Sequence, residues 1–222
     1  MSFSAVLLDL DGTLLNTLPD LADATNAMRI ELGMPPLGQG IVATYLGKGT
    51  HNLVSRALSN SLDAPVNEIM VERGLEIFQH AYHLVNGDKT LLYPGVLEGL
   101  ASFRDQGMRL AVVTNKPQAF TLPLLERTGL LHFFEHVVCG DTCARRKPDP
   151  MPMLHACELL DVAPADTLAI GDSCNDALAA RAAGIAVLAV PYDYNEGQSV
   201  HTLEVDDIVT TIEEAAQWAR NH

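Results

Sequence analysis

Short apolar runs alternate with helical patterns along most of this chain, and no other feature restricts the fold as strongly. The runs have the length of strands, and the stretches between them carry apolar residues at helical spacing. This alternation predicts a parallel sheet with helices on its faces, a Rossmann-like doubly wound α/β fold. The predicted strands are residues 5–10, 109–115, 136–140, 167–172 and 185–190, and the predicted helices are residues 95–106, 117–128, 150–161, 175–183 and 211–220.

Residues 17–87 interrupt this rhythm, because helical patterns follow one another there with no convincing strand between them. Two apolar stripes lie on helical faces and indicate core packing. They are Leu21, Ala24, Met28 and Leu32, and Val71, Leu75, Phe78, Tyr82 and Val85. We therefore expect a small α-helical cap at residues 17–87, inserted into an α/β core made of residues 1–16 and 88–222.

Composition narrows the classes of partner. The chain has 222 residues, of which 48% are hydrophobic, enough for one large domain with an insert. The formal net charge of −14 argues against binding to nucleic acid or to an anionic membrane surface. An anionic substrate would need a local positive site, because the overall field repels it.

The N-terminal residues, the lengths of the apolar runs and the cysteines indicate a cytoplasmic protein. The first residues meet carboxylates early and have no basic region, so we expect no signal peptide, and no apolar run has the length of a membrane span. The four cysteines suggest no disulfide framework, and we expect reduced, structural thiols. They are Cys139, Cys143, Cys157 and Cys174.

Polar side chains collect where the predicted strands end. Ligands of an open parallel sheet bind outside the carboxyl ends of its strands, so these residues are candidates for a common site. They are Asp9, Asp11 and Thr13 after the first strand, Thr114, Asn115 and Lys116 after the second, Lys147 in "RRKPDP", and Asp172, Ser173 and Asp176 after a fourth.

The acids in this set predict a magnesium site. Asp9 and Asp11 begin on the same side of a strand, and Asp172 adds a third carboxylate. Like charges this close repel one another unless a cation lies among them. Oxygen ligands without His or Cys favour Mg²⁺, which commonly joins carboxylates to a substrate phosphate.

The same polar residues at the predicted strand ends suit phosphoryl transfer. One carboxylate can act as nucleophile and form an aspartyl-phosphate, and a second, two residues on, can protonate the leaving oxygen and then activate water. The Thr114 hydroxyl and the Asn115 N–H suit phosphate binding, and Lys147 suits charge neutralisation. Each motif alone is weak, since strand ends and helix caps commonly carry such residues. The ordered set of four makes coincidence improbable.

With these residues in hand, the chain resembles the haloacid-dehalogenase-like phosphohydrolases over essentially its whole length. "DLDGT", "VVTNK", "RKPDP" and "GDSCND" are similar to the four motifs of that family. The resemblance implies that Asp9 is the nucleophile and Asp11 the general acid/base, and that Thr114, Asn115 and Lys147 bind and stabilise the phosphoryl group. It also implies Mg²⁺ held by the Asp9 side chain, the Asp11 carbonyl and Asp172, with Asp176 supporting either the metal site or Lys147.

Three further segments resemble the branch of this superfamily that hydrolyses 2-phosphoglycolate. They are "NTLPDLA", "LGKGTHNLVSRAL" and "PYDYNEGQSV", in which Asn16 and Asp193 depart from the usual residues. The resemblance implies a Mg²⁺-dependent phosphatase of a small phosphorylated metabolite, with 2-phosphoglycolate as the leading candidate. A phosphatase of another small metabolite (a sugar phosphate, a nucleotide or pyrophosphate) stays open, as does a sugar-phosphate mutase. A dehalogenase, a signalling receiver or a non-catalytic binding module fits the motifs less well, and the oligomeric state is not determined.

Five further residues have alternative interpretations. Lys48, with His51, lies in the predicted cap loop "YLGKGTHN" and is a candidate for contacting the far end of the substrate, against the alternative of a solvated loop. Arg145 and Arg146 either add positive potential beside Lys147 or are simply solvated. Cys174 in the fourth motif is either oxidation-sensitive or merely a tolerated small residue.

Overall fold

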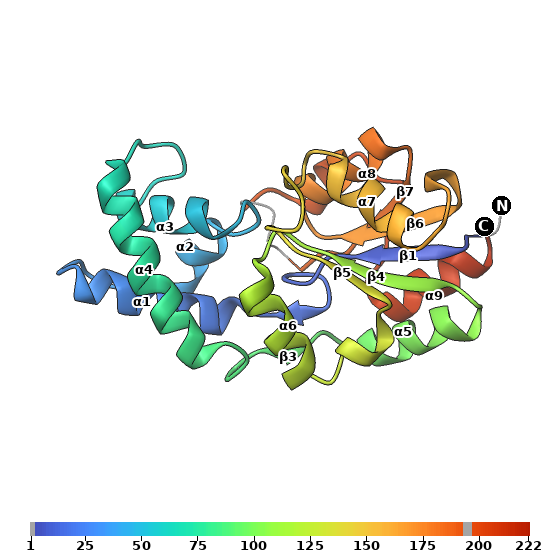
Figure 1. Ribbon diagram of the computed structural model, residues 1–222, viewed down its shortest axis with the longest axis horizontal. Coiled ribbons are helices and arrows are strands. Elements are labelled where there is room, and N and C mark those ends of the chain that lie inside the picture. Colours follow the sequence, from blue (N-terminus) through green and yellow to red (C-terminus); the bar gives the residue numbers. More distant parts are fainter. Residues whose placement is uncertain (1–2, 193–196) are drawn as a thin grey trace.

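A six-stranded parallel sheet forms the centre of the molecule in the computed structural model, which describes residues 3–192 and 197–222 (Figure 1). The predicted α/β sheet is thus confirmed, while Asp193 lies outside the described residues. In sheet order the strands are β5 (His136–Val138), β4 (Arg109–Val113), β1 (Ala5–Leu8), β6 (Thr167–Gly171), β7 (Ala186–Ala189) and β8 (Asp207–Ile208).

β1 is a central strand, which explains its continuous apolar sequence. It pairs in parallel with β4 on one side and with β6 on the other, and all four of its residues are buried. A strand buried on both faces has no need of polar alternation. The five predicted strands are confirmed, with the polar residues at their predicted ends lying just beyond the sheet. β8 was not predicted, because two residues carry no periodicity.

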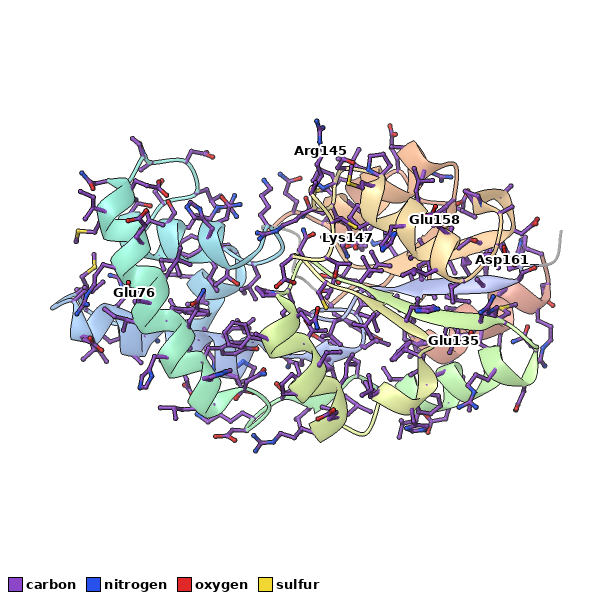
Figure 2. All side chains as sticks on the ribbon, viewed as in Figure 1. Glu76, Glu135, Arg145, Lys147, Glu158 and Asp161 are labelled. Atoms are coloured by element: carbon purple, nitrogen blue, oxygen red, sulfur yellow. The ribbon has the colours of Figure 1, made fainter. Side chains whose placement is uncertain are left out.

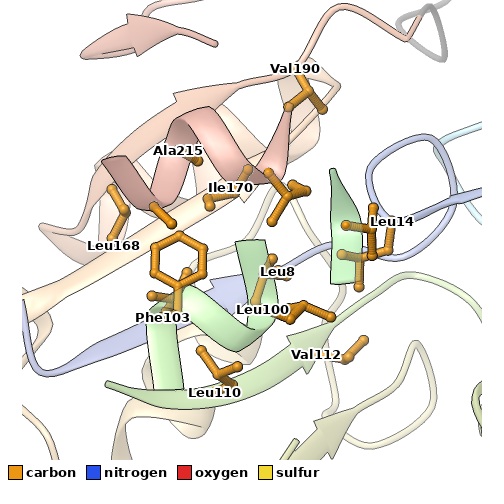
Figure 3. Close-up of a cluster of buried hydrophobic side chains, with 14 of the residues drawn as sticks. Leu8, Leu14, Leu100, Phe103, Leu110, Val112, Leu168, Ile170, Val190 and Ala215 are labelled. Carbon is orange, nitrogen blue, oxygen red and sulfur yellow. The ribbon is translucent and has the colours of Figure 1, made fainter. Parts of the chain in front are cut away.

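Alternate residues of each strand face two helical layers. Val6 and Leu8 of β1 pack with α5 (Val96–Asp105) and α9 (Ile212–Arg220), together with residues of α6 (Gln118–Arg127). Figure 3 shows Leu8 in one cluster with Leu100 of α5 and Ala215 of α9. Ala5 and Leu7 face α7 (Met151–Leu159) and α8 (Cys174–Ala183), where small alanines let these helices approach closely. Burying each large apolar side chain contributes about 1.5–3 kcal/mol, so both layers hold the strand ends in fixed positions.

Four helices form a separate helical unit, residues 18–85, beyond the carboxyl ends of the strands (Figure 1). They surround their own hydrophobic cluster, which includes the predicted stripe residues Leu21, Met28, Phe78 and Tyr82. Phe120 of α6 joins this cluster and connects it to the core. The helices are α1 (Leu18–Glu31), α2 (Gln39–Ala43), α3 (Thr50–Ser59) and α4 (Glu68–Val85).

The chain crosses between core and helical unit twice, at one place. The outgoing strand β2 (Leu15–Asn16) pairs antiparallel with the returning strand β3 (Leu91–Leu92), a two-stranded ribbon that was not predicted. Beside it, the fully buried carboxylate of Asp20 accepts hydrogen bonds from the Gly87 and Lys89 N–H groups and from the Thr90 hydroxyl. A buried acid with three donors ties α1 to the returning chain.

Within the described residues, every helix is too short or too polar to cross a bilayer.

Candidate active site

Four chain segments that are distant in sequence meet at the carboxyl ends of β1, β4 and β6. The Asp9 N–H donates to the Ile170 carbonyl at 3.0 Å, which continues the pairing of β1 with β6 to the strand ends. The Thr13 hydroxyl donates to Asp172 Oδ1 at 2.9 Å and joins the loop after β1 to the loop after β6. Gly12, at φ 84°, makes the turn between Asp11 and Thr13. Figure 2 shows Lys147 beside these strand ends, on the side that faces the helical unit.

Three carboxylates gather at this point. Asp9, Asp172 and Asp176 each contribute an oxygen, and these oxygens lie within 4.8 Å of one another. Gly171 makes the approach possible, because a Cβ there would lie 2.2 Å from the Asp176 Cγ. Burial raises the pKa of Asp9 to about 7 against the opposing effect of Lys147, and burial with the Asp176 and Asp9 charges raises the pKa of Asp172 well above its ordinary value.

The acid cluster fits a hard divalent cation. Asp172 Oδ2 is buried and has no hydrogen-bond donor among the described residues, and the same holds for Asp9 Oδ1 apart from an ion pair with Lys147. Buried oxygens without donors are costly unless a ligand satisfies them. A set of carboxylate oxygens with no His or Cys matches the ligands that Mg²⁺ takes.

Lys147 balances the negative charge of this acid cluster. Its Nζ lies 2.6 Å from Asp176 Oδ1 and 3.0 Å from Asp9 Oδ1, and it donates to the Val113 carbonyl at 2.6 Å. Burial by itself lowers the pKa of Lys147, but the Asp176 and Asp9 carboxylates outweigh burial and raise it. Asp176 also accepts from the N–H and hydroxyl of Ser173 as a capping box of α8, so the lysine has a rigid partner.

Asp11 lies apart from the acid cluster and has partners of its own. Its Oδ1 accepts from the Thr17 hydroxyl at 2.6 Å and lies 3.0 Å from Nζ of the buried Lys116. Lys116 in turn donates to the Tyr82 hydroxyl of α4 at 2.7 Å. The sequence analysis placed Lys116 among the candidate site residues without a specific role, and Tyr82 only in a packing stripe. The signal for Tyr82 was a phenol on an otherwise apolar stripe, since a buried hydroxyl needs a partner.

Thr114 and Asn115 lie beside the acids, as predicted from the end of β4. The Thr114 hydroxyl accepts from the Lys116 N–H at 3.2 Å, which leaves its own proton to donate to a ligand. The Asn115 amide donates to the carbonyls of Gly47 and Lys147 at 3.1 and 3.0 Å. The side chain of Asn115 therefore connects a loop of the helical unit to the strand ends.

A pocket opens between the strand ends and the helical unit, with about 600 Å³ of empty space that includes open solvent. Polar residues of the core form one wall and mainly apolar residues of the helical unit form the other. The lining residues are Asp9, Asp11, Thr114, Asn115, Lys116, Phe120, Asp172 and Ser173 from the core, and Leu21, Leu46, Gly47, Gly49, Thr50, Leu53, Phe78 and Tyr82 from the helical unit.

The residues with alternative interpretations lie outside the lining of the pocket or at its edge. Lys48 is half-buried between two lining glycines but is not itself among the lining residues, so its contact with substrate stays a prediction. The exposed His51 lies 3.2 Å from Glu68 Oε1 of α4. Arg145 projects away from the strand ends and pairs with Asp149 (Figure 2). Cys174, at the start of α8, is half-buried.

Comparison with known proteins agrees with this geometry. The family of haloacid dehalogenase-like hydrolases matches residues 6–190. The phosphoglycolate phosphatase of Nitrosospira multiformis is 48% identical over 217 residues, which cover 98% of this chain and 96% of that protein. The phosphoglycolate phosphatase of Thiobacillus denitrificans is 46% identical, with 97% and 95% covered. A crystal structure of a predicted phosphoglycolate phosphatase from Haemophilus somnus superposes with a TM-score of 0.92 at 32% identity and covers 98% of each chain.

Proposed function

The chain belongs to the haloacid dehalogenase-like hydrolases, and we propose that it is a phosphatase that hydrolyses 2-phosphoglycolate to glycolate and inorganic phosphate. The observation that carries this proposal is the cluster of Asp9, Asp172 and Asp176, with Lys147 paired to Asp9 and Asp176, beside a pocket that Asp9 and Asp172 line. The names of the two curated relatives, which match over nearly their full length, support the choice of substrate.

Magnesium is the proposed cofactor. The side chains of Asp9 and Asp172 and the backbone carbonyl of Asp11 would hold it, with Asp176 in support. Bound there, Mg²⁺ would stabilise negative charge on the phosphoryl oxygens.

Asp9 is the proposed nucleophile. Its carboxylate oxygen attacks phosphorus, the bond from phosphorus to the glycolate oxygen breaks, and an aspartyl-phosphate forms on Asp9. Asp11 donates a proton to the departing glycolate oxygen. Lys147, fixed by Asp176 and the Val113 carbonyl, holds the Asp9 oxygen in position and balances its charge.

Hydrolysis of the intermediate reuses the same residues. Asp11 takes a proton from a water molecule, the water oxygen attacks phosphorus, and the bond between phosphorus and the Asp9 oxygen breaks. The products are inorganic phosphate and the regenerated Asp9 carboxylate. The Thr114 hydroxyl and the Asn115 N–H are the proposed phosphate donors in both steps.

The helical unit is the proposed cap, with residues 17–87 as the inserted domain. It supplies Leu21, Leu46, Leu53 and Phe78 to the pocket, and these apolar side chains would exclude bulk water while the aspartyl-phosphate forms. Lys48, on the loop between Gly47 and Gly49, remains a candidate for substrate contact.

Release of inorganic phosphate from a panel of small phosphate esters tests the proposal. We expect the highest kcat/KM with 2-phosphoglycolate and loss of turnover when EDTA is present, restored by Mg²⁺. A sugar-phosphate mutase would return the phosphoryl group to the sugar without releasing phosphate, and a signalling receiver would retain it. Absence of steady-state phosphate release from every ester would refute a phosphatase.

A further inference from the structure

Lys116 is the single lysine or arginine among the lining residues of the pocket in the part of the chain that the structure describes. Its side chain is 4% exposed, and its Nζ lies 3.0 and 3.3 Å from the two carboxylate oxygens of Asp11. The Tyr82 ring lies below the same Nζ, 4.7 Å from centroid to nitrogen. The carboxylate of Asp11 and the face of the Tyr82 ring both favour the ammonium form of this side chain.

The backbone of Lys116 is fixed on both sides. Its carbonyl accepts from the Gly140 N–H at 2.9 Å and from the Thr121 hydroxyl at 3.2 Å. Its N–H donates to the Thr114 hydroxyl. The ammonium is therefore directed into the pocket by the end of β4 and the start of α6, and does not depend on a mobile loop.

The distribution of charge in the pocket defines the shape of a suitable ligand. A phosphoryl group at Asp9 leaves the rest of the molecule among Leu21, Leu53, Phe78 and Phe120. A second negative charge in such apolar surroundings is costly unless a cation binds it. An ammonium has three N–H donors. The Tyr82 hydroxyl takes one, and the two oxygens of the single Asp11 carboxylate, at 3.0 and 3.3 Å, can share a second, which leaves the third for a ligand.

We propose that Lys116 determines the substrate specificity, by binding the carboxylate of 2-phosphoglycolate while the phosphoryl group lies at Asp9. This inference rests on the proposed function and deepens it. Tyr82 is a positioning residue in this account, because its hydroxyl and ring hold the Lys116 ammonium at the edge of the apolar wall.

Two substrates of equal length isolate the carboxylate. In 2-hydroxyethyl phosphate a neutral hydroxymethyl group replaces the carboxylate of 2-phosphoglycolate, and the quantity to measure is the ratio of the two kcat/KM values. Lys116→Met should lower this ratio roughly 10- to 100-fold, as expected for a lost charge-assisted hydrogen bond. Loss of the Asp11 contact lowers both rates and therefore cancels in the ratio.

Lys89→Met is the matched control, because it removes the same charge from an exposed lysine that does not line the pocket, and it should leave the ratio unchanged. Lys48→Met tests the loop as the alternative carboxylate contact. Inhibition by glycolate should weaken in Lys116→Met and not in Lys48→Met, while inhibition by inorganic phosphate should stay the same in both. If Lys116→Met does not fold, Tyr82→Phe keeps the ring, removes the hydroxyl and should lower the ratio about threefold.

Three results would overturn the inference. An unchanged ratio in a folded Lys116→Met would show that Lys116 only positions Asp11. A ratio that falls in Lys48→Met alone would assign carboxylate binding to the loop. A wild-type protein that hydrolyses phosphate esters without preferring 2-phosphoglycolate would refute the proposed substrate as well, whereas the first two results leave it standing.

Discussion

The core wall of the pocket carries three carboxylates and a buried lysine, whereas the wall from the helical unit is mainly apolar. On the core wall, Lys116 is held by Asp11, and Asp9 pairs with Lys147, which Asp176 holds in turn. On the helical wall, side chains such as Leu53 and Phe78 are held by packing within their own cluster. Changes to the core wall should therefore alter the chemistry, and changes to the helical wall should alter binding and selection.

Asp9→Asn should give the largest effect on the core wall. An amide cannot attack phosphorus as the carboxylate does, so kcat should fall by about 10⁴-fold or more while the fold is retained. Phosphate release and circular dichroism together measure this. Asp105→Asn, at the exposed end of α5, is the matched control and should leave kcat unchanged. Substantial turnover by Asp9→Asn would refute the nucleophile assignment.

Lys147→Met should disturb both activity and stability. It leaves the buried Asp9 and Asp176 carboxylates without their counter-charge, and breaking a buried pair in this way costs about 3–5 kcal/mol. Denaturant unfolding at neutral pH should show most of this loss. A change below about 1 kcal/mol in the free energy of unfolding would mean that the strand-end charges are not coupled as described.

Magnesium affinity should depend on pH through the core wall alone. The raised pKa of Asp9, about 7 instead of 3.8, means that Mg²⁺ must displace a proton below that pH. Calorimetry between about pH 5.5 and pH 7.5 should show an affinity that rises with pH, by about tenfold per pH unit for each proton that Mg²⁺ displaces.

The same raised pKa fixes the sign of the stability change without metal. The fold favours protonated Asp9, so its contribution to stability is present below pH 3.8 and is lost as pH rises to about 7. Asp172, whose pKa is also raised, acts in the same direction. Asp9→Asn should remove its share of this dependence. In the calorimetric experiment, an affinity for Mg²⁺ that does not change with pH would contradict the buried acid cluster.

Asp20→Asn tests the connection between the two regions. The substitution replaces one carboxylate oxygen by an amide NH₂ group, which then faces either the Lys89 N–H or the Gly87 N–H and the Thr90 hydroxyl. Loss of a buried acceptor costs about 1–3 kcal/mol. Thermal unfolding should show a lower Tm, and KM should rise more than kcat falls if the helical unit shifts relative to the core. An unchanged Tm would show that this carboxylate does not hold the crossing.

His51→Ala should give the smallest effect. The exposed pair of His51 with Glu68 contributes little, and His51 does not line the pocket. Both kcat and KM for 2-phosphoglycolate should stay within about twofold of wild type. A selective rise in KM for 2-phosphoglycolate would bring His51 back as a substrate contact.

The core wall was largely predictable from the sequence, because local patterns specify it. Apolar runs marked the buried strands, and Asp9, Thr114 and Asp172 come directly after them, where a parallel sheet must bring them together. Two-residue strands such as β2, β3 and β8 were missed, because their pairing follows from the arrangement of the larger elements rather than from any period of their own.

The helical wall was predictable only as packing. The stripe of α4 indicated a buried Phe78 and Tyr82, but nothing local indicated that the Tyr82 hydroxyl meets Lys116, which lies 34 residues away. The depth of Asp20 and its three donors likewise depend on where the chain returns. Such contacts follow from the way two units pack, which a single segment does not encode.

Borohydride trapping during turnover tests the central claim most directly, because hydride reduces an aspartyl-phosphate to homoserine. Protein quenched with borohydride while it hydrolyses 2-phosphoglycolate in Mg²⁺ should contain homoserine at position 9 in peptide mass spectra, and protein without substrate should contain none. An unmodified Asp9 during sustained phosphate release, or homoserine at another aspartate, would contradict the account.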